Sequence, residues 1–242
     1  MNYLRKIFSK DEILYTIFLF VSIIVIVTNR IFSGFSNILW IIDIASLCCV
    51  LNIIFIAKHN GIFFIFNIIS TSILCFTSIY QHLWFNALVC GVFNLPFTIF
   101  GLVKWIKNEK KNKNTITNLN SFSKKGKILL CIISMVVIGL FTFILYKLNG
   151  NLFYFDAIFS GLCAVGVCLN AFAYIEQFTS FIVADFFGII LYIFLTIQNV
   201  NNLSMIFTYF IMLVLNIVGL VKWNKLFKQK NKMENSTSEK IE

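Results

Sequence analysis

Long apolar runs divide the chain into eight segments that each have the length of a helix. The runs cover residues 13–29, 36–57, 61–80, 83–103, 127–146, 152–175, 178–197 and 203–222. A helix needs roughly 20 residues to cross a hydrocarbon core about 30 Å thick. Lipid offers the backbone no hydrogen-bond partners, so only helices or closed barrels span it, and barrel strands alternate polar and apolar residues. The continuous runs therefore predict an all-α integral membrane protein with eight transmembrane helices.

The composition narrows the classes of protein further. Of the 242 residues, 59% are apolar and 12% are charged. Soluble globular domains average about 45–50% apolar and about 25% charged residues. A soluble core cannot enclose this much apolar surface, so the composition excludes an ordinary soluble enzyme, a disordered chain and a secreted disulfide-rich protein.

The basic residues lie almost entirely on one side of the predicted membrane. The chain has 20 Lys and Arg residues and a formal net charge of +10. If the N-terminus is inside, 18 of the 20 fall in cytoplasmic segments, and only Arg30 and Lys147 lie outside. Cytoplasmic loops collect Lys and Arg, so both termini are predicted to be cytoplasmic. The net charge then reflects topology and contact with the lipid bilayer, and no nucleic-acid partner is expected.

An internal repeat organises the apolar runs. The sequence Gly-Leu-Val-Lys-Trp at 101–105 recurs at 219–223, an offset of 118 residues. The same offset places Asn52 on Asn170 and Asn67 on Asp185. Two three-helix copies separated by one helix run in the same direction, an arrangement known from transporters with parallel repeats.

This 1+3+1+3 order divides the chain into five parts. They are an N-terminal tail with an additional helix at 1–35, a first repeat at 36–107, a loop and linker helix at 108–150, a second repeat at 151–225 and a cytoplasmic tail at 226–242. The polar loop at 104–127 is expected to be mobile, and the tail from 228 onward is expected to be disordered.

Polar residues inside the runs are the candidate substrate site. A carboxylate near the bilayer centre costs about 2.5–3.5 kcal/mol on insertion scales, so Asp185 must face protein or water. Asp43 is the second acid expected along the path between the repeats. Interhelical hydrogen bonding is the alternative explanation for the Asn residues, at about 0.6 kcal/mol per pair on average. The predicted substrate-binding residues are Asp185, Phe181, Phe178, Asn67, Asn52, Asn170, Tyr192, Tyr209 and Asn216.

Aromatic residues accompany the acid on the same helix. Phe178, Phe181 and Asp185 are spaced three and four residues apart, so they are expected to share one helix face. Rings beside a carboxylate suit a flat cationic group, with a cation–π contact worth ~0.5–2 kcal/mol. The alternative is that each ring faces lipid.

The cysteines, two further acids and two tryptophans are expected to have structural roles and not to bind substrate. The seven Cys lie within apolar runs without a C-x-x-C pair, so they are expected to be packing residues, and no metal or cofactor is expected. Asp156 and Glu176, at opposite ends of one helix, are expected to be hydrated. Trp105 and Trp223 are expected to anchor helices at the membrane interface.

Three stretches resemble the PnuC family of vitamin and nucleoside transporters, over about residues 36–224. Residues 155–178 resemble a helix that begins with Asp and ends before an E-x-W-x-x-W pattern. Residues 83–105, with Pro96 and Gly101, resemble the third core helix of the family. Asn216 to Gly219, closed by Trp223, resemble the last one.

The resemblance implies a function and a site. The best-known member of the family imports nicotinamide riboside, and other members carry thiamine, riboflavin or deoxynucleosides. The Trp and Asn positions that help to bind the substrate ring in the family fall on Phe178, Phe181 and Asp185 here, and Thr98 stands where the first repeat often has Asn.

We therefore expect a carrier in a bacterial inner membrane for a nicotinamide riboside-like vitamin or nucleoside. The resemblance implies facilitated diffusion, with a cytoplasmic kinase that traps the product, and a homo-oligomer stays possible. Two alternatives stay open: the substrate-binding membrane component of an ATP-driven vitamin importer, and a thiamine or deoxynucleoside carrier of the same family. A lipid-modifying membrane enzyme is disfavoured, because no loop carries clustered His, Cys or paired acids.

Overall fold

The computed structural model of the chain describes residues 2–33, 37–58, 60–111, 119–147, 152–198 and 203–238. The elements in these ranges are α1 (Asn2–Ser33), α2 (Asn37–Ala57), α3 (Phe63–Tyr80), α4 (Trp84–Leu88), the π-helix η1 (Val89–Asn94), α5 (Leu95–Lys111), α6 (Lys124–Lys147), α7 (Phe153–Ala171), α8 (Glu176–Gln198) and α9 (Leu203–Ser238). Eight helical stretches of the described residues are long and apolar enough to cross a membrane, with α4, η1 and α5 forming one of them. The predicted all-α membrane fold is confirmed.

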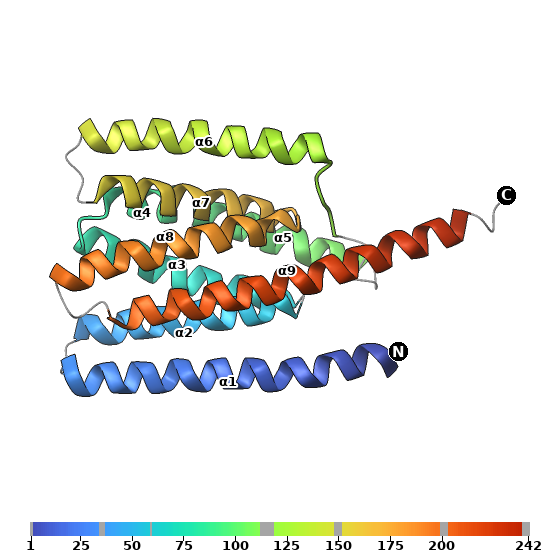
Figure 1. Cartoon of the computed structure of the whole chain (residues 1–242), viewed down its shortest axis with the longest axis horizontal. Helices are drawn as coiled ribbons and strands as arrows, with labels where there is room; N and C mark the ends of the chain where they lie inside the picture. Colours follow the sequence, from blue (N-terminus) through green and yellow to red (C-terminus); the bar gives the residue numbers. More distant parts are fainter. Residues whose placement is uncertain are drawn as a thin grey trace.

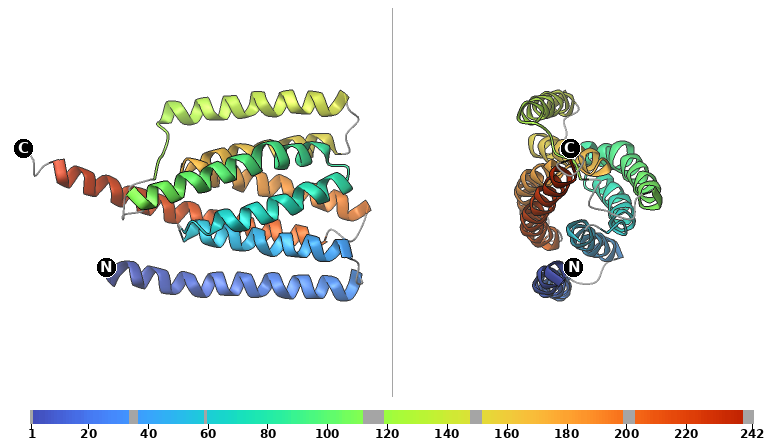
Figure 2. Two further views of the ribbon diagram at one scale, coloured as in Figure 1. Left: turned by 180° about the vertical axis from the view of Figure 1, so that it is seen from behind. Right: turned by 90° about the vertical axis from the view of Figure 1, so that its right-hand side faces the viewer.

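The helices lie side by side, and most of them form a closed ring (Figures 1 and 2). Around the ring α2 packs on α3, α3 on α5, α5 on α7, α7 on α8, α8 on α9, and α9 again on α2. Two helices stand outside it, α1 against α2 and α9, and α6 against α7.

The ring consists of the two predicted repeats. The first repeat is α2, α3 and the α4–η1–α5 span, and the second is α7, α8 and α9. The helices α2 and α7 run in the same direction, so the repeats are parallel (Figure 1). Both chain termini lie at the same end of the bundle, which we call the terminal side, and the opposite end is the far side.

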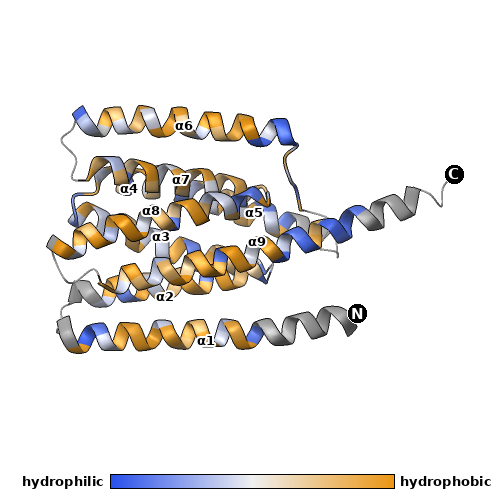
Figure 3. Cartoon of the chain, viewed as in Figure 1, coloured by the Kyte–Doolittle hydropathy of each residue, from blue (hydrophilic) through white to orange (hydrophobic). Residues whose placement is uncertain are grey.

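Hydropathy follows this arrangement (Figure 3). Apolar residues cover most of the length of each helix in the bundle, and hydrophilic residues gather at the two ends of α6 and on the part of α9 that projects beyond the other helices. Only 6% of the spanning window of α6 is buried, so most of the apolar surface of this helix is available to lipid.

The third helix of the first repeat contains a turn of π-helix. Pro96 has no backbone N–H, so it cannot make the i→i−4 hydrogen bond that an α-helix requires at its position. The six residues Val89–Asn94 immediately before Leu95 adopt the wider i→i+5 pattern. The span therefore continues across the proline as one helix with a widened turn.

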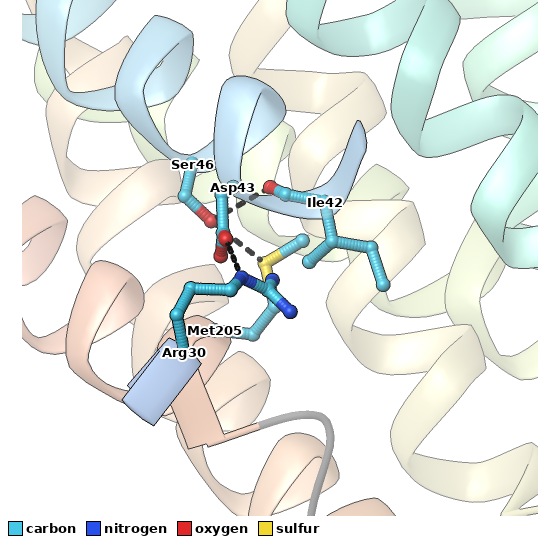
Figure 4. A network of polar contacts seen from close by, with 5 residues as sticks. All are labelled: Arg30, Ile42, Asp43, Ser46 and Met205. Atoms are coloured by element: carbon cyan, nitrogen blue, oxygen red, sulfur yellow. Dashed lines mark hydrogen bonds and ion pairs between the residues drawn. The ribbon is translucent and has the colours of Figure 1, made fainter. Parts of the chain in front are cut away.

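Helix α1 is attached to the ring by a buried ion pair on the far side (Figure 4). The Nε of Arg30 donates to Oδ2 of Asp43 on α2, and both side chains are 3% exposed. The same region contains Ser46, whose hydroxyl lies 3.5 Å from the sulfur of Met205 on α9. Arg30 was expected in the external segment after the first span, but it lies within α1, on the far side. Asp43 was expected along the transport path, and the structure pairs it with α1. The pair forms because each charge, once removed from water, needs the other.

A second attachment of α1 lies towards the terminal side. The ammonium group of Lys222 on α9 donates to the hydroxyl of Tyr15 and lies 4.5 Å from the centre of its ring. The ammonium of Lys58, just after α2, lies 5.5 Å from the same ring. Tyr15 is only 3% exposed. Helix α1 thus bridges the first and second repeats where α2 meets α9.

The polar loop at 104–127, which the sequence suggested to be mobile, is structured in its described parts. Helix α5 continues to Lys111, and residues 119–123 dock on the turn between α7 and α8. The backbone N–H of Asn120 donates to the carbonyl of Ala173, and the N–H of Ile175 donates to the carbonyl of Asn120, each at 3.0 Å. Residues 112–118 lie outside the described residues.

The tail also differs from expectation, because α9 extends to Ser238. Disorder was predicted from residue 228 on account of polarity, but residues 228–238 contain neither Pro nor Gly and several good helix formers. The extension makes a contact with the loop, since Nζ of Lys230 donates to the carbonyl of Leu119 at 3.0 Å. Residues 239–242 lie outside the described residues.

Candidate functional site

Two hydrogen bonds related by the repeat lie in the middle of the ring. In the first repeat Nδ2 of Asn67 on α3 donates to Oγ1 of Thr98 on α5 at 3.0 Å. In the second repeat Nδ2 of Asn216 on α9 donates to Oδ2 of Asp185 on α8 at 2.7 Å. These four positions match pairwise at the offset of 118, and all four side chains are buried.

Side chains from other helices converge on Asp185. Its carboxylate lies within electrostatic reach of the thiols of Cys49 on α2 and Cys163 on α7 and of the phenol of Tyr209 on α9. Cys49 belongs to the first repeat, so Asp185 lies where the two repeats face each other.

Two tyrosines extend this centre. Tyr192 on α8 and Tyr209 on α9 stack with their ring centroids 5.2 Å apart and an interplanar angle of 23°. Tyr209 also meets Phe159 of α7 edge to face at 5.3 Å. Both tyrosines are nearly fully buried and belong to one apolar cluster with Ile42 of α2.

The predicted pair of phenylalanines packs on two different helices. Phe178 is fully buried, and a Cβ at Gly219 of α9 would come within 2.4 Å of its ring. Phe181 is half-buried, and a Cβ at Gly166 of α7 would come within 2.6 Å of its ring. Of the two rings, Phe181 is therefore the one not enclosed by packing.

Asn52 and Asn170 occupy equivalent positions on α2 and α7. Asn170 is buried and Asn52 is half-buried. Within the described part of the chain, Oδ1 of each residue has no hydrogen-bond partner. Neither is bonded to the Asn67 and Asp185 pairs, so the structure does not join them to the central hydrogen bonds.

The repeated tryptophans do not serve as simple interfacial anchors. Trp223 is 0% exposed and meets Phe178 edge to face at 5.2 Å. Its Nε1 donates to the carbonyl of Ile56 on α2 at 3.2 Å, so it connects the second repeat to the first. Trp105 is half-buried and packs edge to face on Phe63. The interfacial interpretation fails for Trp223 because a neighbouring helix covers it.

Asp156, expected to be hydrated, is 1% exposed. It accepts a hydrogen bond from Ser160 at 3.0 Å and bonds from the backbone of Phe85 and Asn86 at the start of α4. Ser160 also donates to Oδ1 of Asn86 at 3.1 Å. The network joins α7 to the first repeat on the far side, where helix α4 supplies unpaired N–H groups.

Glu176 is likewise not hydrated as expected, since it is 7% exposed. Its Oε1 accepts from the hydroxyl of Ser121 at 2.7 Å and from the backbone N–H of Phe122 at 3.1 Å. The ammonium of Lys127 lies 3.0 Å from the same oxygen. Glu176 thus holds the docked segment 119–123 on the second repeat.

The docked segment inserts one apolar side chain between the repeats. Leu119 is 0% exposed. Its cluster includes Ile56 and Phe63 of the first repeat and Phe178 and Trp223 of the second. On the terminal side the two repeats are therefore joined by apolar packing around Leu119.

Sequence reasoning missed one further polar residue, Gln177. Its side chain is 0% exposed, and neither Oε1 nor Nε2 has a hydrogen-bond partner among the described residues. A glutamine at the end of an apolar run is normally hydrated, so neither its residue type nor its position predicted that it is buried. The available signal was its spacing of four residues from Phe181, which places both on one helix face.

An apolar cavity of about 230 Å³ lies outside this centre, between α4–η1, α6 and α7. Its lining includes Phe85, Val89, Val137, Phe141, Ala164 and Leu169. The lining offers almost no polar surface, so it cannot recognise a hydrophilic solute. Among the described residues, no group of three or more His, Cys, Asp or Glu side chains is arranged to hold a metal ion.

The ring of two parallel three-helix repeats, closed around a polar centre, defines the fold of a membrane transporter. The profile of the nicotinamide mononucleotide transporter family matches residues 39–225. The chain belongs to this family, as the resemblance to PnuC proteins predicted.

A solved structure has the same fold. The structure described as "Crystal structure of the Vitamin B3 transporter PnuC" superposes with a TM-score of 0.74 over 90% of this chain and 92% of that chain, at 20% sequence identity. None of the curated proteins compared with the chain matches it. The family match covers both repeats and leaves out all of α1.

Proposed function

We propose that the chain carries a nicotinamide riboside-like vitamin or nucleoside across a bacterial inner membrane by facilitated diffusion. The distribution of Lys and Arg supports a cytoplasmic terminal side, and with it a far side that faces outward. A cytoplasmic kinase that phosphorylates the arriving substrate would keep it inside and maintain the gradient.

The observation that carries this proposal is the pair of equivalent hydrogen bonds, Asn67 to Thr98 and Asn216 to Asp185, at the centre of the ring. In transporters built from repeats, the substrate site lies near the membrane midplane where the repeats meet. A centre shared by two similar bundles can be exposed to either side when one bundle rotates against the other. The substrate shifts that equilibrium only by its different affinity for the two states.

Charge favours a cationic substrate without phosphate. Asp185 adds a carboxylate to the centre, and the sequence has no Lys or Arg within 31–57, 59–103 or 148–221 to bind a phosphate group. Nicotinamide riboside carries a positive ring, and nicotinamide mononucleotide adds a phosphate to it. We therefore favour the nucleoside over the nucleotide. The free Oδ1 atoms of Asn52 and Asn170 are acceptors that suit ribose hydroxyl groups.

The segment 119–123 supplies the cytoplasmic gate in this mechanism. Leu119 lies between the repeats, and Glu176 holds the segment through Ser121, Phe122 and Lys127. Release to the cytoplasm then requires Leu119 to leave the cluster that contains Phe63 and Phe178. Closing the opposite side relies on the Asp156 network and on the packing of α2 against α9.

Uptake into proteoliposomes that contain only this chain tests the proposal. We expect saturable entry of labelled nicotinamide riboside, without ATP, that continues longer when a nicotinamide riboside kinase and ATP are enclosed. Competition with thiamine, deoxynucleosides and nicotinamide mononucleotide ranks the alternative substrates. Absence of uptake by the chain alone, together with copurification of an ATPase, would instead support the ATP-driven importer.

A further inference from the structure

Gln177 is a buried amide for which the described part of the chain provides no partner. It lies in the first turn of α8 and is 0% exposed, yet both polar atoms of its side chain lack a hydrogen bond among the described residues. A buried primary amide that keeps neither its donor nor its acceptor engaged is destabilising. Sequences retain such a group where another molecule completes it.

Two contacts with neighbouring helices show which way this part of α8 faces. On one side of the helix the hydroxyl of Ser180 donates to the carbonyl of Leu162 on α7 at 2.8 Å. On the other side Phe178 packs against Gly219 of α9. Gln177 lies between these two directions, since successive residues turn by about 100° around a helix.

The face of α8 that carries Gln177 also carries residues near the centre of the ring. Phe181, Ala184 and Gly188 follow Gln177 at intervals of three or four residues, and Ala184 is 0% exposed. Asp185 borders this face on the α9 side, where it accepts from Asn216. Gln177 therefore lies on the inward line of α8, about two turns towards the terminal side from Asp185.

Within the described ranges, no hydrogen bond uses the polar atoms of the Gln177 side chain. The neighbouring Glu176 makes the contacts to Ser121, Phe122 and Lys127 that hold the docked segment. The backbone N–H of Gln177 is engaged by the carbonyl of Tyr174 at 3.3 Å, but this leaves the side chain unaffected.

We propose that Gln177 binds the carboxamide of the substrate, an inference that rests on the proposed function. Two primary amides pair through two antiparallel hydrogen bonds, because each offers one N–H donor and one carbonyl acceptor. A carboxylate in the same place offers two acceptors, leaves the Gln177 carbonyl unpaired and adds a negative charge on the helix face that already carries Asp185. Gln177 thus selects the amide over the acid form of a pyridine nucleoside.

The test compares nicotinamide riboside with nicotinic acid riboside in proteoliposomes that contain the full chain. In the wild-type protein we expect the acid to compete at least about tenfold more weakly than the amide. Gln177→Leu should raise KM for the amide about tenfold and leave competition by the acid nearly unchanged, so that discrimination disappears. Phe181→Ala, which removes a ring but no hydrogen bond, should weaken both compounds equally and serves as the matched control.

Each outcome decides the inference. If Gln177→Leu weakens the binding of both compounds equally, or raises the unfolding temperature without changing uptake, Gln177 does not bind the carboxamide. Thermal unfolding checks each variant, and Gln177→Met, which keeps the length of the side chain but removes both hydrogen-bonding groups, provides a second test should the leucine variant fail to fold: it should also lose selectivity for the amide. A wild-type protein that takes up neither compound contradicts the proposed function itself, whereas uptake without discrimination contradicts only the role of Gln177.

Discussion

The two repeats make the same central hydrogen bond with opposite polarity. In the first repeat the middle helix donates, from Asn67 to Thr98, and in the second the middle helix accepts, at Asp185 from Asn216. An ionised carboxylate can only accept, so the change from amide to acid reverses the donor. A carboxyl group therefore lies on one side of the centre and a carboxamide at the equivalent position on the other.

The terminal-side ends of the repeats differ in the same way. Lys58 and Glu176 correspond at the offset of 118 residues. Lys58 lies over the ring of Tyr15 and so contacts α1, whereas Glu176 binds the segment that precedes α6. Each additional piece of chain outside the repeats is attached to one of two equivalent positions, by charges of opposite sign. The comparison indicates that the repeats share architecture while chemistry is assigned to each one separately.

The largest effect is expected from making the centre neutral with Asp185→Asn. Interactions with a charged group contribute about 1.5–3 kcal/mol, so KM for a cationic substrate should rise about 10- to 100-fold. The amide oxygen still accepts from Asn216, so the unfolding temperature should change little. Uptake kinetics and thermal unfolding measure the two quantities.

Asn67→Asp is the control for this prediction, because it adds a charge at the equivalent position of the first repeat. In the double variant with Asp185→Asn, the charge has moved from one repeat to the other. An Asp185→Asn protein with the wild-type KM would remove the carboxylate from the site.

The next largest effect is expected from substituting the glycines that occupy equivalent positions in the two repeats. A Cβ at Gly219 would lie 2.4 Å from the ring of Phe178, and a Cβ at Gly101 would lie 2.6 Å from the ring of Phe64. Overpacking of this kind costs about 1–3 kcal/mol, so Gly219→Ala and Gly101→Ala should both lower the unfolding temperature.

Gly101→Ala should cost more, since the Cα of Ala171 lies 3.1 Å from the added carbon and backbone yields less than a ring. Gly139→Ala on α6 is the matched control, because its Cβ meets no atom within 4 Å. That variant should be neutral or slightly stabilising, as expected for Ala in a helix. Equal loss in all three variants would show that close packing at Gly101 and Gly219 is not responsible.

A smaller effect is expected from Glu176→Gln, which removes a charge from the docked segment. The exposed Lys127 contributes little, and the bonds from Ser121 and Phe122 weaken, for a combined loss of about 1 kcal/mol. In a Leu119→Cys background, a water-soluble thiol reagent should label position 119 roughly 3- to 10-fold faster. Lys58→Gln, at the equivalent position, should leave the labelling rate unchanged. Equal acceleration by both would indicate general loosening of the terminal side.

The smallest effect is expected from removing the neutral hydrogen bond between Asn67 and Thr98 in the first repeat. Thr98→Val removes the acceptor of Asn67, which keeps its bond from the hydroxyl of Thr71 at 3.2 Å. Hydrogen bonds between membrane helices average about 0.6 kcal/mol, so KM should change by no more than about threefold. A loss as large as that of Asp185→Asn would mean that the first repeat also carries a principal contact to the substrate.

The repeat allowed much of the fold to be predicted. Once 101–105 aligned with 219–223, the direction of each helix and the pairing of Asn67 with Asp185 followed from one offset. The central bonds could not be predicted in full, because the offset places equivalent residues on equivalent faces but does not say which neighbouring helix each face meets.

Other parts of the site could not be predicted because they depend on contacts between distant segments. Arg30 looked like an external charge, since hydropathy marks where a helix ends but not that a long side chain turns back to Asp43. Leu119 is a single apolar residue in a polar stretch, and composition cannot show that it is 0% exposed. Gln177 and Trp223 share this difficulty, because helix ends normally meet water and here meet another part of the chain.

The widened turn η1 distinguishes the third span of the first repeat from its equivalent, α9, in the second repeat. Thr98 and Asn216 correspond at 118 residues, but the starts of their helices, Trp84 and Leu203, are 119 residues apart. One surplus residue in an ordinary α-helix would rotate everything after it by about 100° and turn Thr98 away from α3. A π-helical turn takes up that residue locally, so Thr98 and the five-residue signature after it keep the orientation that their equivalents have in the second repeat.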